Sequence, residues 1–321
     1  MRRAFTRWLS GDPPAIAGAW LDQSGVCLVV MDWSDASPRL AQVIYEPGGQ
    51  FAVRVNDEAG FNSAEVTNAL RCAYEKLGSG SYALALGIPS ADIFIKTIEI
   101  PTGLDDQQIA QLSVVEAVSN LPVPPEEVCS DFLRRSLDTQ SNHEQVDLAF
   151  CKRDVIDTLR LLAEDADIAL AVVDRDIQAI HDAALWCLAA QHGLANVQYP
   201  LGLLLLGEDA RLVIGRSALD LTSYELHSDS GQHSEEALRA ILEALKLYCR
   251  RAGLTDGPHG YLKQLLVSGH GAAAAAEVFN REMVAERVDE IDLRLLAGMA
   301  GNGVPLNGLM VATGMALRRS A

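Results

Sequence analysis

The chain contains 321 residues, with 26 Lys and Arg against 43 Asp and Glu, and its formal net charge is −17. Nucleic-acid affinity comes mainly from cationic side chains that release counterions from phosphates, so a chain this acidic is not expected to bind DNA or RNA. Hydrophobic residues make up 49% and charged residues 21% of the sequence, which excludes a largely disordered chain. The length favours about two domains, and every apolar stretch is far shorter than the roughly 20 residues that cross a bilayer.

Residues 1–14 form a short basic segment. Arg2, Arg3 and Arg7 supply its charge, and Trp8 follows them. A Pro-Pro pair stands where a signal peptide would have its apolar core, so no signal peptide is predicted. Contact with anionic lipid and a solvated, flexible terminus both remain open for this segment.

The next residues predict an α/β unit. Two apolar strands are expected within residues 15–30, joined by a polar turn at 22–25 as in a β-hairpin. A strand at 42–46 follows, and then a helix at 63–77, whose apolar side chains recur every three or four positions. The apolar run 81–87 is typical of a buried strand.

Residues 89–166 predict a small α+β subdomain inserted between pieces of a larger domain. Its first strand alternates in polarity and stops at Pro101, and Asp105 and Asp106 then suit the positive end of a helix. The expected order is strand, helix, strand, strand, helix. These elements are placed at 94–101, 104–121, 129–137, 145–152 and 155–166.

A second large unit begins with a strand at 169–173 and a helix at 177–191. Another apolar strand–turn–strand follows at 201–216, so a hairpin opens each half of the chain. Duplicated units of this kind are typical of the actin-like nucleotide-binding architecture, although any α/β protein supplies similar turns. The remaining expected elements are a helix at 234–252, a strand at 262–267, an alanine-rich helix after the loop 268–271, a glycine-rich loop at 298–303 and a helix from Leu309.

Six cysteines and seven histidines are scattered through the chain without the spacing of a metal site. Because the cysteines form no Cys-x-x-Cys pair and most lie in apolar patterns, we predict buried thiols in a reducing cytoplasm. Neither Ser24-Gly25 nor Ser268-Gly269 has the surroundings of a hydrolase nucleophile. We therefore expect no catalytic residue and no metal ligand.

Residues 87–132 carry the most specific pattern in the sequence. A Gly-Ile-Pro-Ser run leads into a Lys-Thr strand, a helix with a Glu, a proline-rich stop and an Asp-Phe strand. This order resembles the type IV pilus assembly protein PilM family, and the resemblance extends over nearly the whole chain. The residues that carry it are 87–90, 96–101, Glu116, 121–128, Asp131, Phe132, 171–174 and 311–318.

The resemblance implies an actin-like α/β fold like that of the cell-division protein FtsA. In this fold, two domains of duplicated ribonuclease-H-like units carry a small inserted α+β subdomain, and the elements expected at 89–166 fall where that subdomain belongs. The implied divisions are a flexible basic segment at 1–14, a first actin-like domain at 15–88 and 167–197, the inserted subdomain at 89–166, and a second actin-like domain at 198–321.

The nucleotide-binding hairpins of the PilM family are poorly matched. In the first hairpin, Trp20 stands where the family has an acid, Asp22 where it has a glycine and Cys27 where it has a lysine. In the second, Leu205 replaces an aspartate, and two acidic residues follow Gly207. Carboxylates at these turns would repel a triphosphate.

Only part of a nucleotide site is therefore expected to remain. The loop Ser268-Gly269-His270-Gly271 resembles the adenosine-side loop of the family, but a turn that needs glycine explains it as well. We expect no required cofactor, no ATP hydrolysis, and at most weak binding of ATP with Mg²⁺. The residues that could still contact a nucleotide are Ser24, Gly25, Gly207, Ser268, Gly269 and Gly271.

The resemblance implies a cytoplasmic adaptor of type IV pilus or competence machinery. Such a protein lies at the cytoplasmic face of the inner membrane, where it binds the N-terminal tail of a PilN-type bitopic protein and joins other pilus inner-membrane assembly proteins. An acidic adaptor should prefer a basic tail. Two alternatives remain: an active ATPase of the same fold, and a cytoplasmic protein like GspL of type II secretion, whose family continues into a transmembrane helix.

Strand 94–100 is the candidate edge to which such a peptide could add. The candidate groove residues are Phe94, Lys96, Ile98 and Ile100, with Ile95, Thr97 and Glu99 on the opposite face of the strand. Packing of one of these faces into the core of the subdomain is an equal alternative.

Overall fold

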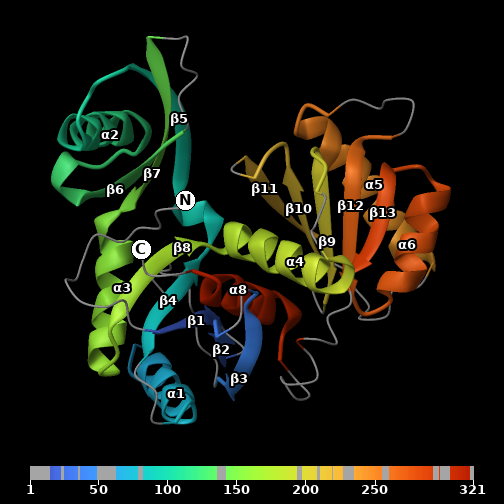
Figure 1. Ribbon diagram of the computed structural model, residues 1–321, viewed down its shortest axis with the longest axis horizontal. Helices are drawn as coiled ribbons and strands as arrows, with labels where there is room; N and C mark the ends of the chain where they lie inside the picture. Colours follow the sequence, from blue (N-terminus) through green and yellow to red (C-terminus); the bar gives the residue numbers. More distant parts are fainter. Residues whose placement is uncertain are drawn as a thin grey trace.

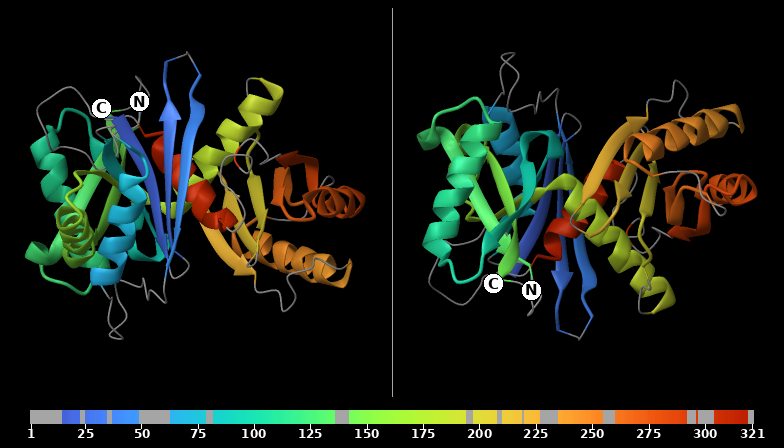
Figure 2. Two further views of the ribbon diagram at one scale, coloured as in Figure 1. Left: turned by 90° about the horizontal axis from the view of Figure 1, so that it is seen from below. Right: turned by 90° about the horizontal axis from the view of Figure 1, so that it is seen from above.

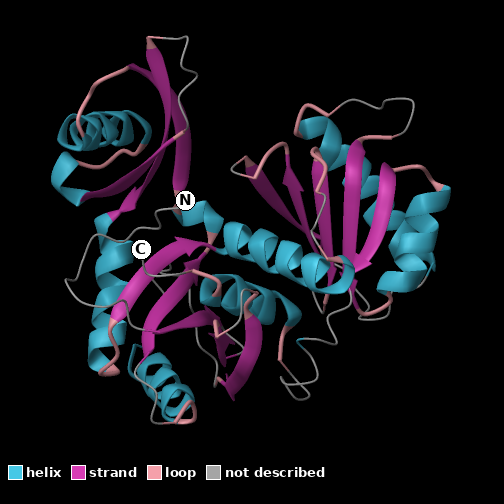
Figure 3. Ribbon diagram, in the orientation of Figure 1, coloured by secondary structure: helices cyan, strands magenta, loops and turns pink. Residues whose placement is uncertain are grey.

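The computed structural model contains three β-sheets with helices packed on and between them (Figure 1, Figure 3). The predictions made for 1–14, Ser24 and 298–303 lie outside the residues that it describes. The described residues are 15–22, 25–34, 37–48, 63–78, 82–135, 142–193, 197–207, 210–218, 220–226, 235–254, 260–291, 296 and 304–318.

The first sheet has five strands in the order β3-β2-β1-β4-β8. The expected hairpin forms from β1 and β2, which are antiparallel, while β4 and β8 run parallel to β1. The apolar runs of β2 and β4 are buried on both faces, as in a sheet covered on both sides. The strands are β1 (Ala15–Asp22), β2 (Gly25–Asp32), β3 (Arg39–Pro47), β4 (Tyr82–Ile88) and β8 (Leu170–Arg175).

The second sheet repeats this order as β11-β10-β9-β12-β13. Its hairpin is also antiparallel, and β12 and β13 run parallel to β9. The duplication predicted from the two apolar hairpins is therefore confirmed, and the chain has the actin-like α/β fold. The strands are β9 (Leu201–Leu206), β10 (Ala210–Gly215), β11 (Leu221–Leu226), β12 (Leu262–Gly269) and β13 (Ala285–Ile291).

A three-stranded antiparallel sheet in the order β5-β7-β6 lies between the pieces of the first sheet in the sequence. Helix α2 (Asp106–Asn120) covers one of its faces, and Asp105 and Gln108 form a capping box at the start of this helix. The order strand, helix, strand, strand, helix is as predicted. The strands are β5 (Phe94–Pro101), β6 (Val128–Arg134) and β7 (His143–Lys152), and α3 (Arg153–Asp165) follows.

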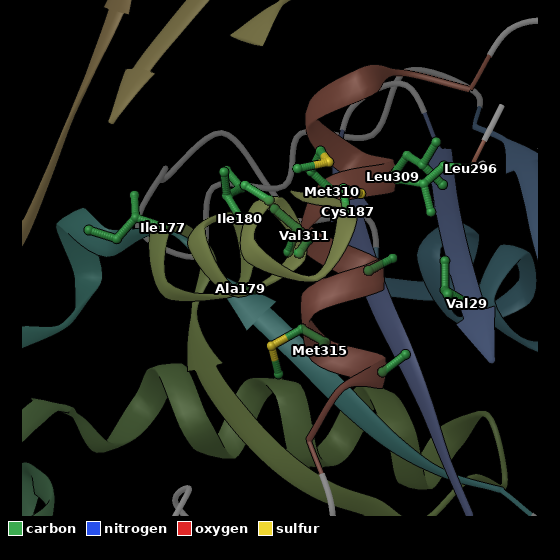
Figure 4. Close-up of a cluster of buried hydrophobic side chains, with 14 of the residues drawn as sticks. Val29, Ile177, Ala179, Ile180, Cys187, Leu296, Leu309, Met310, Val311 and Met315 are labelled. Carbon is green, nitrogen blue, oxygen red and sulfur yellow. The ribbon is translucent and has the colours of Figure 1, made fainter. Parts of the chain in front are cut away.

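Helices α4 (Asp176–His192) and α8 (Leu306–Ala316) lie side by side between the two large sheets (Figure 1, Figure 2). A Cβ atom at Gly314 would lie 1.9 Å from the carbonyl oxygen of Ala179, so only glycine permits this approach of the two backbones. Around this contact, Met310 and Val311 of α8 pack with Ile180 of α4 in a core that joins both sheets (Figure 4).

The outer faces of the two large sheets are covered by separate pairs of helices. On the first sheet, α1 (Ser63–Glu75) and α3 contribute to one buried cluster with β2 and β4. On the second sheet, α5 (Glu235–Arg251) and α6 (Ala272–Arg281) contribute to another (Figure 1). None of the described helices is long and apolar enough to cross a membrane.

Strands β11 and β13 were not predicted. Both are edge strands of the second sheet, and each has a polar sequence because part of it is exposed. In β13 four of the seven residues are charged, a composition that edge strands tolerate but that resembles a loop in a sequence read alone.

Candidate functional site

The glycines and serines predicted for a nucleotide site fall into two groups. Strands β9 and β12 are parallel and paired so that Leu206 lies opposite Gly269. Gly207, Ser268 and Gly269 therefore lie together at the carboxyl ends of these two strands. Gly271 follows as the N-cap residue of α6. Gly25 lies apart from them, at the start of β2 in the first sheet.

Local structure accounts for the glycine loop after β12. Gly269 has a φ of +105°, and a Cβ atom there would lie 2.2 Å from the carbonyl oxygen of Leu206. The His270 N–H donates a hydrogen bond to that same oxygen at 2.9 Å. The Ser268 hydroxyl is buried and donates to the Ile291 carbonyl at 3.2 Å. The loop is thus held by contacts within its own sheet.

The first hairpin is held by apolar contacts at Trp20 and Cys27. A Cβ atom at Gly308 would lie 2.2 Å from the Trp20 ring, so the indole packs directly on the first turn of α8. Cys27 is fully buried in the core between the sheets, and this burial raises the pKa of its thiol to about 12. The side chains of Asp22, Glu208 and Asp209 lie outside the described residues.

A buried ion pair connects the start of α4 with β10 of the second large sheet. Asp176 begins α4, and its carboxylate lies 2.6 Å from the guanidinium of Arg211 on β10. The same carboxylate accepts a hydrogen bond from the Ser90 N–H at 3.0 Å and another from the Ser90 hydroxyl. Arg211 also donates to the Ser223 hydroxyl of β11 at 3.3 Å. Asp176 therefore joins the end of β4, the start of α4 and the second sheet.

Removal of one partner of this ion pair should lower the stability of the fold. The two side chains are 12% and 11% exposed, so each charge has lost most of its hydration. Removing one partner from a buried pair typically costs about 3–5 kcal/mol, because the other charge is left without compensation. An anion that entered between the halves would have to compete with Asp176 for the guanidinium of Arg211.

A second buried network fixes the end of α8. The Arg318 guanidinium lies 2.8 Å from the Asp174 carboxylate and 2.5 Å from that of Asp182. Burial alone would lower the pKa of Arg318, but the two carboxylates outweigh it and raise this pKa. Asp182 also lies 3.1 Å from His181, whose other ring nitrogen is 2.7 Å from the Tyr199 hydroxyl. The network thus reaches from the C-terminal segment to the start of the second sheet.

The predicted groove residues on β5 lie on the face that α2 covers. Ile100 is 3% exposed and packs in the core beneath α2 with Ile98 beside it. Lys96 forms an ion pair with Glu116 of α2 at 2.5 Å. Phe94 stacks on Phe150 with the ring centroids 5.9 Å apart and remains 44% exposed. Of the four residues, Ile100 therefore belongs to the core, and Phe94 is the apolar side chain that a partner could reach.

A cavity of about 790 Å³ borders β5, with Phe94 from one face of the strand and Ile95 and Thr97 from the other in its lining. This cavity lies between the three-stranded sheet and the second large sheet, and residues at the end of β4 and the start of α4 close one side of it. Strands β5 and β11 are both edge strands, so the cavity separates two sheet edges. Its lining includes Ile95 and Thr97 of β5, Leu221, Thr222 and Ser223 of β11, and Ser90.

Three arginines line this cavity, and each has a polar partner. Arg135 pairs with Asp147 at 2.7 Å, and Arg216 pairs with Asp220 at 2.7 Å. Arg175 is mostly buried, and this burial lowers its pKa although Asp174 and Asp176 oppose the shift. The charges of Arg135 and Arg216 are therefore each offset by a nearby carboxylate.

The sequence prediction missed both ion-pair networks. Asp176 and Arg211 are 35 positions apart, and Arg318 and Asp182 are 136 apart, so spacing could not connect them. One signal was present: Arg211 interrupts an otherwise apolar strand, and a charge in a buried strand needs a partner. The described residues contain no cluster of His, Cys, Asp or Glu that could hold a metal ion.

Two duplicated sheets, a helix pair between them and an inserted three-stranded sheet define an actin-like protein of the type described for FtsA and PilM. Comparison with protein families gives a match to the type IV pilus assembly protein PilM family over residues 21–196. The chain therefore belongs to the PilM family and is a type IV pilus assembly component. No curated protein matches the sequence.

Several solved structures are similar to this chain at low sequence identity. A PilM–PilN type IV pilus biogenesis complex contains a chain that is 17% identical, with a TM-score of 0.60, and the match covers 94% of this chain and 98% of that one. The cytoplasmic domain of EpsL, an inner-membrane component of the type II secretion system of Vibrio cholerae, is 13% identical with a TM-score of 0.45 over 78% and 80% of the chains. The polyphosphate/ATP-glucomannokinase of Arthrobacter sp. strain KM is 12% identical, with a TM-score of 0.45 over 96% and 99%.

Proposed function

We propose that this chain is a cytoplasmic adaptor that binds the N-terminal tail of a PilN-type bitopic protein during type IV pilus or competence pseudopilus assembly. The supporting observation is the family match over 21–196, which includes the whole three-stranded sheet with its helix. The similar solved chain was described as part of a complex of PilM with PilN. Through such a partner the chain would lie at the cytoplasmic face of the inner membrane, beside the other assembly proteins.

The cavity beside β5 is the place where an extended tail fits best. Among the described strands, β5 has β7 as its single neighbour, so its other edge is open to a further strand. A peptide that adds to a sheet edge gains main-chain hydrogen bonds, and its alternate side chains enter pockets on the two faces. Phe94 on one face and Ile95 on the other are 44% and 39% exposed, and both line the cavity. We propose that they are the main apolar contacts.

Charge would act at long range rather than in the cavity. The net charge of −17 attracts a basic tail toward the protein and raises its association rate. Inside the cavity, however, Arg135 and Arg216 are already paired with carboxylates, so a basic residue gains little there. The preference for a basic tail would therefore act on the rate of association and not on contacts inside the cavity.

We propose further that the chain does not turn over ATP. The Trp20 ring packed on α8 and the fully buried Cys27 thiol support this proposal. The family resemblance sets these two residues where an acid and a lysine would serve the metal ion and the phosphates. Peptide binding by the adaptor would then be independent of nucleotide.

A fluorescence anisotropy titration with a labelled PilN-type N-terminal peptide tests the proposed contact. Ile95→Lys should weaken binding about tenfold or more, which corresponds to about 1.4 kcal/mol. Leu247→Lys is the matched control, because Leu247 is 44% exposed, close to the 39% of Ile95, but lies on α5, outside the cavity lining. Equal affinities of the two variants would place the peptide elsewhere, and absence of binding to the unaltered chain would contradict the proposed partner.

A further inference from the structure

Two cysteines lie directly opposite each other at the base of the three-stranded sheet. Cys129 of β6 and Cys151 of β7 are register partners in the antiparallel pair. Directly opposite residues have Cα atoms about 4.5–5.5 Å apart, and a disulfide needs about 4.4–6.8 Å. The backbone of this sheet therefore already holds the two residues at a separation suitable for a disulfide. Both are free thiols in this structure.

The two thiols differ in exposure and in hydrogen bonding. Cys151 is fully buried, whereas Cys129 is half-buried at the edge of the same cluster. The Cys151 S–H donates a hydrogen bond to the Cys129 sulfur, and this bond lowers the pKa of Cys129 to about 7. Burial opposes the shift and Arg153 supports it. The same hydrogen bond and burial raise the pKa of Cys151.

The charged groups around the pair lie on neighbouring elements. Arg153 and Asp157 come from α3 and Asp131 from β6, and all three act on Cys129. Asp154 of α3 and Asp92 before β5 act on Cys151. Of these groups, Arg153 alone favours a thiolate at Cys129. By comparison, burial raises the pKa of Cys27 and of Cys249 to about 12, so those thiols stay protonated.

We propose that Cys129 and Cys151 form a reversible redox site that a hydroperoxide oxidises to a cross-strand disulfide. The Cys129 thiolate attacks the distal oxygen of the peroxide, the O–O bond breaks, and the alcohol or water leaves after taking a proton. The resulting Cys129 sulfenic acid is attacked by the Cys151 sulfur, the S–O bond breaks, and the hydroxide leaves as water with the Cys151 proton. Two thiols and one hydroperoxide thus give one disulfide, one alcohol or water, and one water.

The position of this pair gives the oxidation a structural consequence. Cys151 belongs to the core of the first sheet, and β7 ends one residue later, where α3 begins. The Arg153 side chain donates to the Glu126 carbonyl at 2.7 Å and to the Val128 carbonyl at 2.8 Å, so α3 is tied to the start of β6. A disulfide would therefore lock β6 to β7 at the junction between the inserted sheet and the first large sheet.

Limited oxidation of the full chain with hydrogen peroxide tests the proposal. After unfolding and alkylation, the oxidised chain should have four reactive thiols in place of six, and peptide mass spectrometry should find Cys129 linked to Cys151. Dithiothreitol should restore all six. Persistence of both thiols while Cys72, half-exposed on α1, becomes oxidised would overturn the proposal.

Variants separate the two roles. Cys151→Ser should accumulate a Cys129 sulfenic acid that a 1,3-diketone reagent traps, whereas Cys129→Ser should leave Cys151 alkylatable. Cys72→Ser should behave like the unaltered chain. If a variant fails to fold, the rate of thiol loss in the unaltered chain decides: it should rise with pH through about 7, as the Cys129 thiolate forms. A rate that rises only above pH 8 would contradict the assignment of Cys129 as the reactive thiol.

Discussion

The contacts between the two large sheets and the open edge of β5 differ in how their polar groups are satisfied. Between the sheets, Asp176 is paired with Arg211 and accepts two hydrogen bonds from Ser90, and Trp20 packs on α8. Beside β5, a strand edge is open and two large apolar side chains, Phe94 and Ile95, are exposed. Asp176 and Arg211 thus offset each other's charge within the chain, whereas the edge of β5 still has main-chain groups to offer a partner.

The two regions contribute differently to the fold. The duplicated strand order and the packing of helices α4 and α8 are supported by the buried apolar cluster between the large sheets. The edge of β5 takes no part in that cluster, so a change there should leave the fold intact, whereas a change in the buried ion pairs should lower its stability.

The largest effect is expected from Arg318→Met. This change leaves the buried carboxylates of Asp174 and Asp182 without their cation, and the free energy of unfolding should fall by about 3–5 kcal/mol. Urea denaturation measures the change. The matched control is Arg160→Met, because Arg160 is 58% exposed and its ion pairs on α3 contribute little, within about 0.5 kcal/mol. Similar losses in the two variants would show that the network at Arg318 has no special role.

The pair Asp176–Arg211 should give the next largest effect. Arg211→Met and Asp176→Asn should each lower the free energy of unfolding by about 3 kcal/mol, because each leaves a partner that is only about a tenth exposed. The double variant should lose less than the sum, with a coupling of about 1–3 kcal/mol in a double-mutant cycle. Additive losses would indicate that the halves are not joined through this pair.

A smaller effect is expected from pH on the stability of the reduced chain. The hydrogen bond from Cys151 lowers the pKa of Cys129 from its ordinary value of 9.0 to about 7 in the folded state. The stabilisation by the thiolate is thus fully present above pH 9 and is lost as the pH falls through about 7. Between pH 9 and pH 7 the unaltered chain should lose more stability than Cys129→Ser, as followed by urea denaturation under reducing conditions. Parallel pH profiles would contradict the hydrogen bond.

The smallest effect concerns salt. Because the arginines that line the cavity are already paired, the dissociation rate constant of a PilN-type peptide should change less than about threefold between ~0.05 and ~0.5 M salt, whereas the association rate constant should fall as the net charge is screened. Stopped-flow anisotropy at the two ionic strengths measures both rate constants. A steep rise of the dissociation rate with salt would mean that charge, and not the edge of β5, holds the peptide.

The sequence predicted those parts of the fold whose pattern is local. Strand β9 is an unbroken apolar run and strand β5 alternates up to a proline, and both were placed at the residues where they occur. Strands β11 and β13 escaped prediction because edge strands keep polar, half-exposed residues. Partners that only the fold brings together, such as Asp176 with Arg211, have no local pattern to reveal them.

The candidate site was predictable to a similar extent. The strand at 94–100 was a candidate edge, and β5 is an edge strand of its sheet, but its sequence does not show which of its two faces α2 covers. Ile98 and Ile100 lie beneath that helix, whereas Ile95 lines the cavity. The alternation of side chains in a strand defines two faces but does not show which of them is buried. The tertiary packing determines that.

The central claim is that a peptide binds beside β5 independently of ATP. Calorimetric titration of the full chain with a PilN-type N-terminal peptide, with and without Mg-ATP, tests it most directly. We predict the same affinity and enthalpy in both titrations, and no heat of ATP binding or turnover in a separate injection series. Micromolar ATP binding with turnover, or peptide binding only when ATP is present, would contradict the account and support an active ATPase of the same fold.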